Sequence, residues 1–543
     1  MRKNQRILAT SHRHPHGTDT GDWIEDEVAG CFFQDVRHGK RLRQLLEQFS
    51  NRIGATTPWA VQDWANAKAA YRFFANDRIS EANILAGHFA STQERCAAMS
   101  GFPLLVLHDT TELSYRHEDT APISIAVKTR VDKGKLKQPR YHTSCGILMH
   151  SSLAVTVAGQ PLGLTAIKFW NRDKFHGANR LKRRINPTRV PIEKKESIRW
   201  LENLRQSTEL LNDPARCVHI GDRESDIYEL FCMAQELGTH FLVRTCVDRL
   251  AGDGGHTVGA EMRRLPVQGL HRVEVRNKRG EFSTAVLEIR YRRLTVCPPI
   301  GKQKQYPNLI LTAIHAREKK KPKGRDKIDW KLLTDLPVRS SKEAAEKLDW
   351  YAQRWKIETF HKILKSGCKA EEARLRTAER LVNLIAILCV LSWRIFWITM
   401  LNRTRPEASP DEAFTELDRY LLDELTPDKS TASRRPTLAH YIIKLARLGG
   451  YLARAHDPPP GNTVIWRGLL RLTDIELGII IGARLVGIKA GIHAYALSSI
   501  RVKTHPPRSE MHRRLFRNSD LVNIGFVPIT ECSDRLRLLA GRV

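Results

Sequence analysis

The chain has 543 residues, which is too long for one ordinary hydrophobic core and predicts two to four domains with room for an enzyme. Lys and Arg number 89 against 59 for Asp and Glu, and the formal charge of +30 is spread from Arg2 to Arg542. Such a charge favours a polyanionic partner, but it does not separate DNA from RNA, or either from a merely well-solvated basic surface.

The cysteines and the first residues exclude some classes of protein. Ten cysteines are scattered without a CxxC pair or a Cys/His cluster, which excludes a zinc module and favours a reduced, cytoplasmic location. The start MRKNQRILATSHRH lacks the apolar region of a secretory signal, so we expect no export. The apolar stretch Leu381–Leu401 contains Arg394, and we expect a buried helix there and no membrane span.

The first part of the chain predicts helices followed by strands. Residues 22–95 have a helical pattern, with Ser80 as an N-cap. From Phe102 onward, strand-like and helix-like segments alternate, which is typical of an α/β protein. Strands are expected at 102–109, 144–157, 159–170, 216–222 and 240–246, and helices at 193–211 and 226–237.

A β-rich insertion and a helical end complete the expected α/β fold. The strand-like pieces of the insertion are 271–277, 284–296 and 308–316, separated by turns rich in Gly, Pro and Lys. A strand at 330–336 precedes a long helix at 341–365, and further helices reach Gly478. Residues 479–543 show no periodicity, and no role is assigned to them.

Two aspartates are expected at strand ends. Asp109 closes the strand FPLLVLHD, and Asp222 closes CVHIGD, 113 residues later. A carboxylate at the end of a strand points out of a sheet edge, where a metal ion could bind. Either aspartate taken alone is equally well explained as the N-cap of a following helix.

The predicted helix at 341–365 carries a more specific pattern. Tyr351, Arg354, Glu358 and Lys365 stand at i, i+3, i+7 and i+14, which at about 100° per residue fall on one narrow face. Apolar residues lie on a separate face: Ile357, Phe360 and Leu364. An acid beside several cations suits a carboxylate next to a phosphate backbone, and the alternative is a solvated, salt-bridged face.

Two Asp and one Glu together suit metal-dependent phosphodiester chemistry. Two Mg²⁺ ions need oxygen ligands such as three converging carboxylates, and they act on the attacking and leaving oxygens. Phosphoryl transfer needs positioning and charge neutralisation, so the lack of a serine or cysteine nucleophile motif is no objection. Water and then a DNA 3′-hydroxyl can attack.

With these residues in view, three segments resemble the bacterial insertion-sequence transposases of the DDE class, in the branch with a Tyr-Arg-Glu-Lys signature, the insertion sequence four family. The segments are HDTTELSYRH, HIGDRESDIY and YAQRWKIETFHKILKSG, and the spacing Tyr-x2-Arg-x3-Glu-x6-Lys is met in full. AYRFF near Tyr71 and ARLGGYL near Leu448 extend the resemblance to residues 20–480. The first ten residues and the tail beyond 480 have no expected counterpart.

The resemblance implies a fold and a division into domains. It implies an RNase H-like catalytic core with a β-rich insertion, flanked by N-terminal and C-terminal helical domains. The implied parts are an end-binding domain at 1–82, a catalytic domain at 83–400 with the insertion at 247–336, a dimerisation domain at 401–480 and a tail at 481–543.

The resemblance also implies roles for single residues. Asp109, Asp222 and Glu358 would be the catalytic, metal-binding acids, holding two Mg²⁺ ions for which Mn²⁺ substitutes. Trp330 would stack on a base flipped out of the duplex, which is worth roughly 1 to 3 kcal/mol, although a core tryptophan at a strand start is an alternative. The remaining DNA contacts would come from Tyr351, Arg354, Lys365, Lys362, His361, Arg244, Arg37, Arg41 and Arg72.

The implied activity is cut-and-paste transposition by a nucleoid-associated protein. The enzyme would bind the inverted-repeat ends of a mobile element in double-stranded DNA, nick them, form and open a hairpin, and join the ends to target DNA. It would work as a synaptic homodimer through residues 437–478, with no membrane involved. Two alternatives remain open: an inactive end-binding inhibitor, and an RNase H-like structure-selective nuclease.

Overall fold

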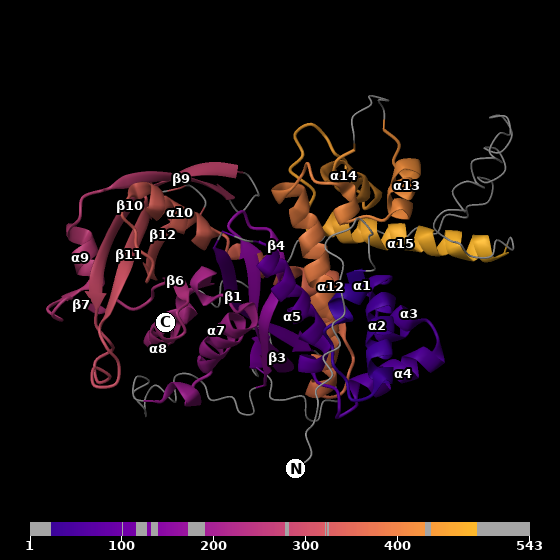
Figure 1. Ribbon diagram of the computed structural model, residues 1–543, viewed down its shortest axis with the longest axis horizontal. Coiled ribbons are helices and arrows are strands. Elements are labelled where there is room, and N and C mark those ends of the chain that lie inside the picture. The colour runs from indigo at the N-terminus through magenta and orange to yellow at the C-terminus, as the bar shows by residue number, and fades with distance from the viewer. Residues whose placement is uncertain are drawn as a thin grey trace, which may run out of the picture. The chain divides into compact units, whose positions relative to one another are not determined.

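The computed structural model of the chain (Figure 1) places a mixed β-sheet between helical N-terminal and C-terminal regions. It describes residues 23–99, 101, 103–115, 127–131, 140–171, 190–276, 282–320, 322, 325–428 and 436–485. One compact unit reaches Ile479, and the second unit, Ile480–Val543, is described only through Leu485.

Five helices form the N-terminal region, as the sequence predicts. They are α1 Trp23–Val28, α2 Val36–Ser50, α3 Thr57–Val61, α4 Trp64–Phe74 and α5 Glu81–Ala98. Ser80 caps α5 in a capping box with Asn83, which confirms the predicted N-cap. In α2 the buried residues recur at helical spacing, at Leu42, Leu45, Leu46 and Phe49, so one face packs and the basic face stays outside.

β1 lies near the centre of the first part of the sheet. The strands of this part are β1 Leu104–Tyr115, β2 Val127–Val131, β3 Arg140–Thr156, β4 Pro161–Trp170, β5 Cys217–Gly221 and β6 His240–Arg244. β1 and β3, and β3 and β4, pair antiparallel, whereas β5 runs parallel to β1 and β6 runs parallel to β5. The alternation of side chains along β1 sends Leu105 and Leu107 to one face and His108 to the other.

The β-rich insertion extends this same sheet. Its elements are β7 Leu250–Ala251, β8 His256–Thr257, α9 Val258–Arg264, β9 Gly269–Arg276, β10 Phe282–Val296, β11 Leu309–Glu318 and β12 Asp329–Thr334. β12 pairs antiparallel with both β6 and β11, so the strand order continues from β6 into the insertion without a break. The predicted insertion is therefore part of a twelve-stranded sheet.

Helices cover both faces of the sheet. α7 Ile198–Leu211 and α8 Tyr228–Glu236 pack on the face of His108, with Trp200 of α7 near its ring. α10 Ser341–Ala352, α11 Trp355–Lys362 and α12 Ala378–Thr404 contribute to the core that contains Leu105 and Leu107.

The long apolar helix α12 is a core helix. In the described residues it is the one helix long and apolar enough to cross a membrane, but 89% of its apolar window is buried inside the protein. Its Asn383 donates hydrogen bonds to Phe74 O and Ile79 O of the N-terminal region. The Arg394 guanidinium lies over the rings of Trp397 and Trp23. These contacts confirm the expected burial of residues 381–401.

The C-terminal helices have a core of their own. They are α13 Glu416–Leu425, α14 Leu438–Leu448 and α15 Asn462–Leu485. Leu422, Ile442 and Ile465 from the three helices are fully buried in one cluster.

Three predicted element boundaries are corrected by the structure. β1 does not end at Asp109, because antiparallel pairing with β3 carries it on to Tyr115. The single helix expected at 341–365 is divided into α10, α11 and a π-helical turn, Ile363–Gly367. The helix expected from 193 begins at Ile198, after a 3-10 turn at Ile192–Lys194.

Candidate active site

Three acidic residues reach one edge of the sheet from different elements. The parallel pairing of β1 with β5 ends at Leu107 and Ile220, so Asp109 and Asp222 both stand two residues beyond it. The carboxyl ends of parallel strands meet at one edge, which is where α/β sheets bind their ligands. Glu358 comes from the first turn of α11, which contacts β1.

Arg354 links the helix acid to the strand acid. Its Nη2 lies 2.8 Å from Glu358 Oε1, and its Nη1 lies 4.0 Å from Asp109 Oδ1. The guanidinium is buried and lies over the ring of Trp355, 4.7 Å from its centroid. Gln353 and Arg354 keep right-handed helical angles at the junction of α10 and α11, so the helix break leaves Arg354 and Glu358 on one face.

Burial and neighbouring charges raise the pKa of two of the three acids, Asp222 and Glu358. Burial raises the pKa of Asp222, and the negative charge of Asp109 raises it further. Burial also raises the pKa of Glu358, partly offset by Arg354, while both aspartates add to the rise. Because the charge of Asp109 disfavours the ionised form of Asp222, and both aspartates disfavour the ionised form of Glu358, the three acids share one electrostatic site.

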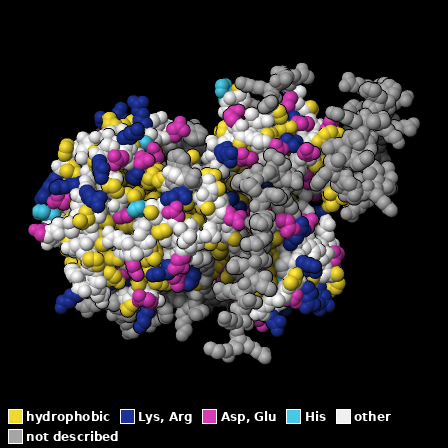
Figure 2. All heavy atoms as spheres, in the orientation of Figure 1, with side chains coloured by type: hydrophobic (Ala, Val, Ile, Leu, Met, Phe, Trp, Pro, Cys, Tyr) yellow, Lys and Arg dark blue, Asp and Glu magenta, His cyan; other side chains and the backbone are white. Residues whose placement is uncertain are grey.

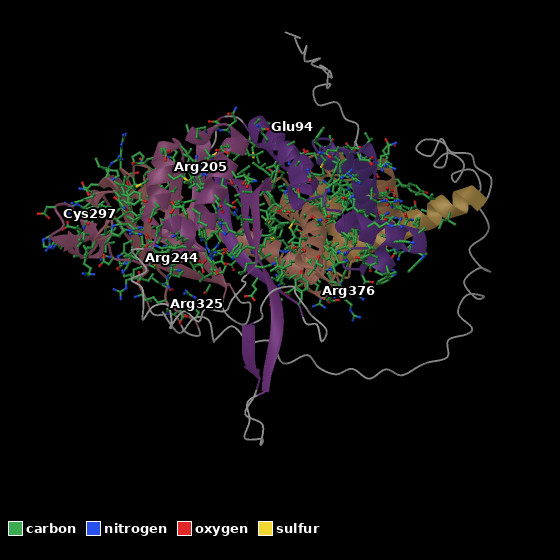
Figure 3. The ribbon with its side chains drawn as sticks, turned by 90° about the horizontal axis from the view of Figure 1, so that it is seen from below. Glu94, Arg205, Arg244, Cys297, Arg325 and Arg376 are labelled. Carbon is green, nitrogen blue, oxygen red and sulfur yellow. The ribbon has the colours of Figure 1, made fainter. Side chains whose placement is uncertain are left out.

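An aromatic and basic group lies beside the acids. Tyr351 at the end of α10 is buried, and its ring meets Trp330 of β12 edge to face, with centroids 5.2 Å apart. Burial raises the pKa of the Tyr351 hydroxyl, while hydrogen bonding from Arg244 and the charge of Arg354 favour its ionised form. Arg244, the last residue of β6, lies on the same side of the protein as Arg325 and Arg376 in Figure 3.

The other cations of the predicted helix have different surroundings. Lys365 lies in the π-helical turn, and its Nζ donates to the carbonyl of Glu112 at 2.5 Å. Lys362 is exposed at the end of α11. His361 is buried and faces the sheet, with Nε2 2.7 Å from Ser151 Oγ and Nδ1 3.6 Å from Asp109 Oδ2.

Comparison with known families explains this edge of the sheet. Residues 200–393 match the family model described as the transposase DDE domain, which contains both Asp222 and Glu358. Residues 20–79 match the transposase DNA-binding model, and residues 390–486 match the transposase Tn5 dimerisation domain. The chain is a DDE transposase.

The three matches give the transposase its general properties. It is an enzyme that cleaves DNA and transfers strands, it binds DNA, and it forms a dimer. The DDE domain implies an RNase H-like core. Transposases with this domain use divalent metal ions, generally Mg²⁺.

The oxygen atoms of the three carboxylates suit such an ion in kind, but their spacing in this structure does not form a metal site. Within the described ranges, no three His, Cys, Asp or Glu side chains are grouped closely enough to hold a metal. The oxygen-only donor set is the one that Mg²⁺ prefers, and the mutual repulsion of the acids is relieved by a cation between them. Glu358 is paired with Arg354, which neutralises its charge.

The predicted arginines of the DNA-binding region are at the surface of the transposase. Arg37 is 88% exposed and pairs with Asp35, the N-cap of α2, at 2.7 Å. Arg41 donates to Asn66 Oδ1 of α4, and Arg72 of the same helix is exposed. Figure 2 shows Lys and Arg side chains over α2–α4 and over the insertion near β9 and α9.

Sequence reasoning missed two parts of the site. Arg199 of α7 donates to Thr110 Oγ1, next to Asp109, and pairs with Glu224 at 2.6 Å. Below them, three buried histidines hydrogen-bond to strand and helix hydroxyls: His108 to Ser152, His150 to Thr110 and His219 to Thr208. Only pairing register and helix docking bring these residues together, so spacing along the chain carries no signal for them.

Proposed function

We propose that the chain is a cut-and-paste transposase of the insertion sequence four family, which binds the inverted-repeat ends of a mobile element and joins them to target DNA. The observation that carries the proposal is that Asp109, Asp222 and Glu358 reach one edge of the sheet beside Arg354, where burial and the two aspartates raise the pKa of Glu358. The Tyr-Arg-Glu-Lys spacing of the α10–α11 region supports this branch of the DDE transposases.

The three acids would hold two Mg²⁺ ions, or Mn²⁺ in their place. Bound there, the ions supply Lewis acidity to the attacking and leaving oxygens of the phosphodiester. Arg354 would supply positive charge from the protein itself. Its guanidinium can move from Glu358 to a phosphate oxygen of the DNA. DNA binding would thereby free Glu358 to join the two aspartates.

A hairpin step requires a base to leave the duplex near the cut. Trp330 is half-buried and packs edge to face on the buried ring of Tyr351, so Trp330 can offer a ring face to the base. Arg244 and Lys365 would contact the DNA backbone. Base flipping costs a few kcal/mol and is offset by stacking on an aromatic ring. We propose that nicking, hairpin formation, hairpin opening and strand transfer use this one site in turn.

The helical regions would bring the DNA to the catalytic core. We propose that residues 1–82 bind transposon ends, that residues 83–400 form the catalytic domain, and that residues 401–480 mediate the synaptic dimer. The buried apolar cluster of α13–α15 gives the dimerisation region a stable base, and residues 437–478 of that region would carry the subunit contact.

The test is cleavage of a labelled DNA fragment that carries the element's own inverted-repeat end. We expect Mg²⁺-dependent nicking at the repeat boundary, lost with EDTA and in the Asp222→Ala variant. Glu358→Gln should bind the fragment with unchanged affinity and fail to nick it, because a neutral amide is a poor ligand for Mg²⁺. Nicking by Glu358→Gln at the parental rate would remove Glu358 from the site. End binding by the parent protein without any cut would favour the inhibitor.

A further inference from the structure

His361 is on the same helix as Glu358 and faces Asp109 of β1. It follows Glu358 by three residues on α11, so both side chains leave the same side of the helix. Its side chain is only 7% exposed, and its two ring nitrogens face different strands. Nε2 lies 2.7 Å from Ser151 Oγ of β3, and Nδ1 lies 3.6 Å from Asp109 Oδ2 of β1.

The sheet itself fixes the partners of this histidine. Asp109 and Ser151 are directly opposite each other in the antiparallel register of β1 and β3. Directly opposed side chains on a sheet lie on the same face. The imidazole of His361 can therefore contact Asp109 and Ser151 at the same time. It does so only when α11 packs at one particular position along β1 and β3.

We propose that His361 is a positioning residue that orients the Asp109 carboxylate for the metal and sets its separation from Glu358. This proposal rests on the proposed function, in which Asp109 and Glu358 are metal ligands. When the Ser151 hydroxyl donates to Nε2, the proton of the neutral ring is on Nδ1 and faces Asp109 Oδ2. The contact of 3.6 Å shortens to a hydrogen bond when the carboxylate binds a cation.

The arrangement gives Asp109 a defined orientation. Arg354 Nη1 faces Oδ1 at 4.0 Å, while His361 Nδ1 faces Oδ2 at 3.6 Å. Both side chains come from the α11 region, and Arg354 leaves when a phosphate binds it, as proposed above. His361 stays, because Ser151 holds its other nitrogen in the core. Groups that hydrogen-bond to metal ligands fix the orientation of those ligands and support metal affinity.

Two other roles for His361 fit the structure less well. A Ser-His-Asp nucleophile is excluded by burial, because Ser151 is fully buried within β3 and no phosphate can reach its hydroxyl. A DNA contact through the ring would require both nitrogens to leave their present partners. The neighbouring Lys362 is exposed and is the better candidate for the backbone contact.

The experiment measures Mn²⁺ binding to the full-length protein without DNA, by electron paramagnetic resonance of the free ion. In this state Glu358 stays paired with Arg354, so Asp109 and Asp222 are the acids available to the ion. We expect His361→Ala to weaken binding about 10- to 100-fold. His361→Asn should recover part of the loss, because its amide N–H can reach toward Asp109 from the position of Nδ1. Ser151→Ala should weaken binding less than His361→Ala, since it only releases the far side of the ring. Circular dichroism establishes that each variant is folded.

Two matched variants separate the possible failures. Lys362→Ala should bind Mn²⁺ like the parent and bind a DNA end more weakly. His361→Ala should bind Mn²⁺ more weakly and bind a DNA end like the parent. If His361→Ala and His361→Asn bind Mn²⁺ within twofold of the parent while Asp109→Asn does not bind it, the positioning role is wrong and the metal site stands. If Asp109→Asn still binds Mn²⁺ and still nicks, the assignment of the acid itself fails, and the role of His361 fails with it.

Discussion

The carboxyl group of Asp222 is partly buried, and folding opposes its charge. Its pKa is raised by burial and by Asp109, so the folded protein holds the proton more tightly than the unfolded chain does. The resulting loss of stability is absent below the ordinary pKa of an aspartate and fully present above the raised pKa. The folded protein is therefore less stable at neutral pH than it would be with an uncharged side chain at this position, and such perturbed acids are common at active sites.

Asp222→Asn should accordingly stabilise the protein at neutral pH in EDTA. We expect Tm to rise by about 1 to 2 °C at pH 7.5, and the gain to shrink as the pH falls through the raised pKa toward the ordinary one. Scanning calorimetry at pH 7.5 and pH 4 measures both. Asp253→Asn is the matched control, because Asp253 accepts a backbone N–H two residues ahead at 2.9 Å, as Asp222 does, but is exposed. A lower Tm for Asp222→Asn at pH 7.5 would contradict the argument.

Substitution of Trp330 tests whether stacking on its ring supports the proposed hairpin step. Trp330 is half-buried and meets Tyr351 edge to face, so it can pack and still offer a face to a base. Trp330→Ala should slow hairpin formation about tenfold more than the first nick, because stacking of 1 to 3 kcal/mol is needed only after the base leaves the duplex. Denaturing gels of an end-labelled fragment resolve the two products. Trp330→Phe should keep most of the rate, and equal slowing of both steps in Trp330→Ala would indicate packing alone.

At the scale of elements, periodicity predicted the helices and most strands, but pairing decided where they end. The sequence predicts that the strand ends at Asp109, yet Leu113 and Tyr115 are buried because β3 pairs with the whole segment. The helix break near Gln353 has no Pro or Gly to announce it, since it arises from the docking of α11 on the sheet. The positions of the acids could be predicted from the sequence pattern, whereas those of Ser151 and Arg199 could not. Strand register brings Ser151 opposite Asp109, and the docking of α7 brings Arg199 to Thr110.

The packing of α1 on α5 depends on a helix position without a side chain. A Cβ at Gly87 of α5 would lie 2.2 Å from the backbone carbonyl oxygen of Glu27 in α1. Gly87→Ala must therefore separate the two helices, and we expect it to lower the free energy of unfolding by about 1 to 3 kcal/mol. Gly478→Ala on α15 is the control, because nothing lies within 4 Å of its Cβ. It should be neutral or stabilise by up to about 1 kcal/mol. Urea titrations of both variants test this, and equal midpoints would contradict it.

The whole molecule carries a charge of +30, which is far more than the active site needs. Lys and Arg are seen over the DNA-binding helices and also over the insertion (Figure 2). Charge distributed in this way attracts DNA of any sequence and raises the rate of encounter. Specificity for the element's ends must then come from base contacts, since phosphate contacts position the protein without reading sequence.

Binding of the transposase to its ends should therefore depend steeply on salt. With 6 to 10 phosphate contacts, we expect the affinity to fall by roughly 10³ to 10⁵ between 50 and 200 mM salt. Arg72→Ala removes one exposed cation of α4, and it should reduce the slope of log affinity against log salt by about 1 and weaken specific and nonspecific DNA alike. Fluorescence anisotropy with an end fragment and a scrambled fragment measures both effects. If Arg72→Ala weakens binding of the end fragment alone and leaves the slope unchanged, Arg72 reads bases and does not contact a phosphate.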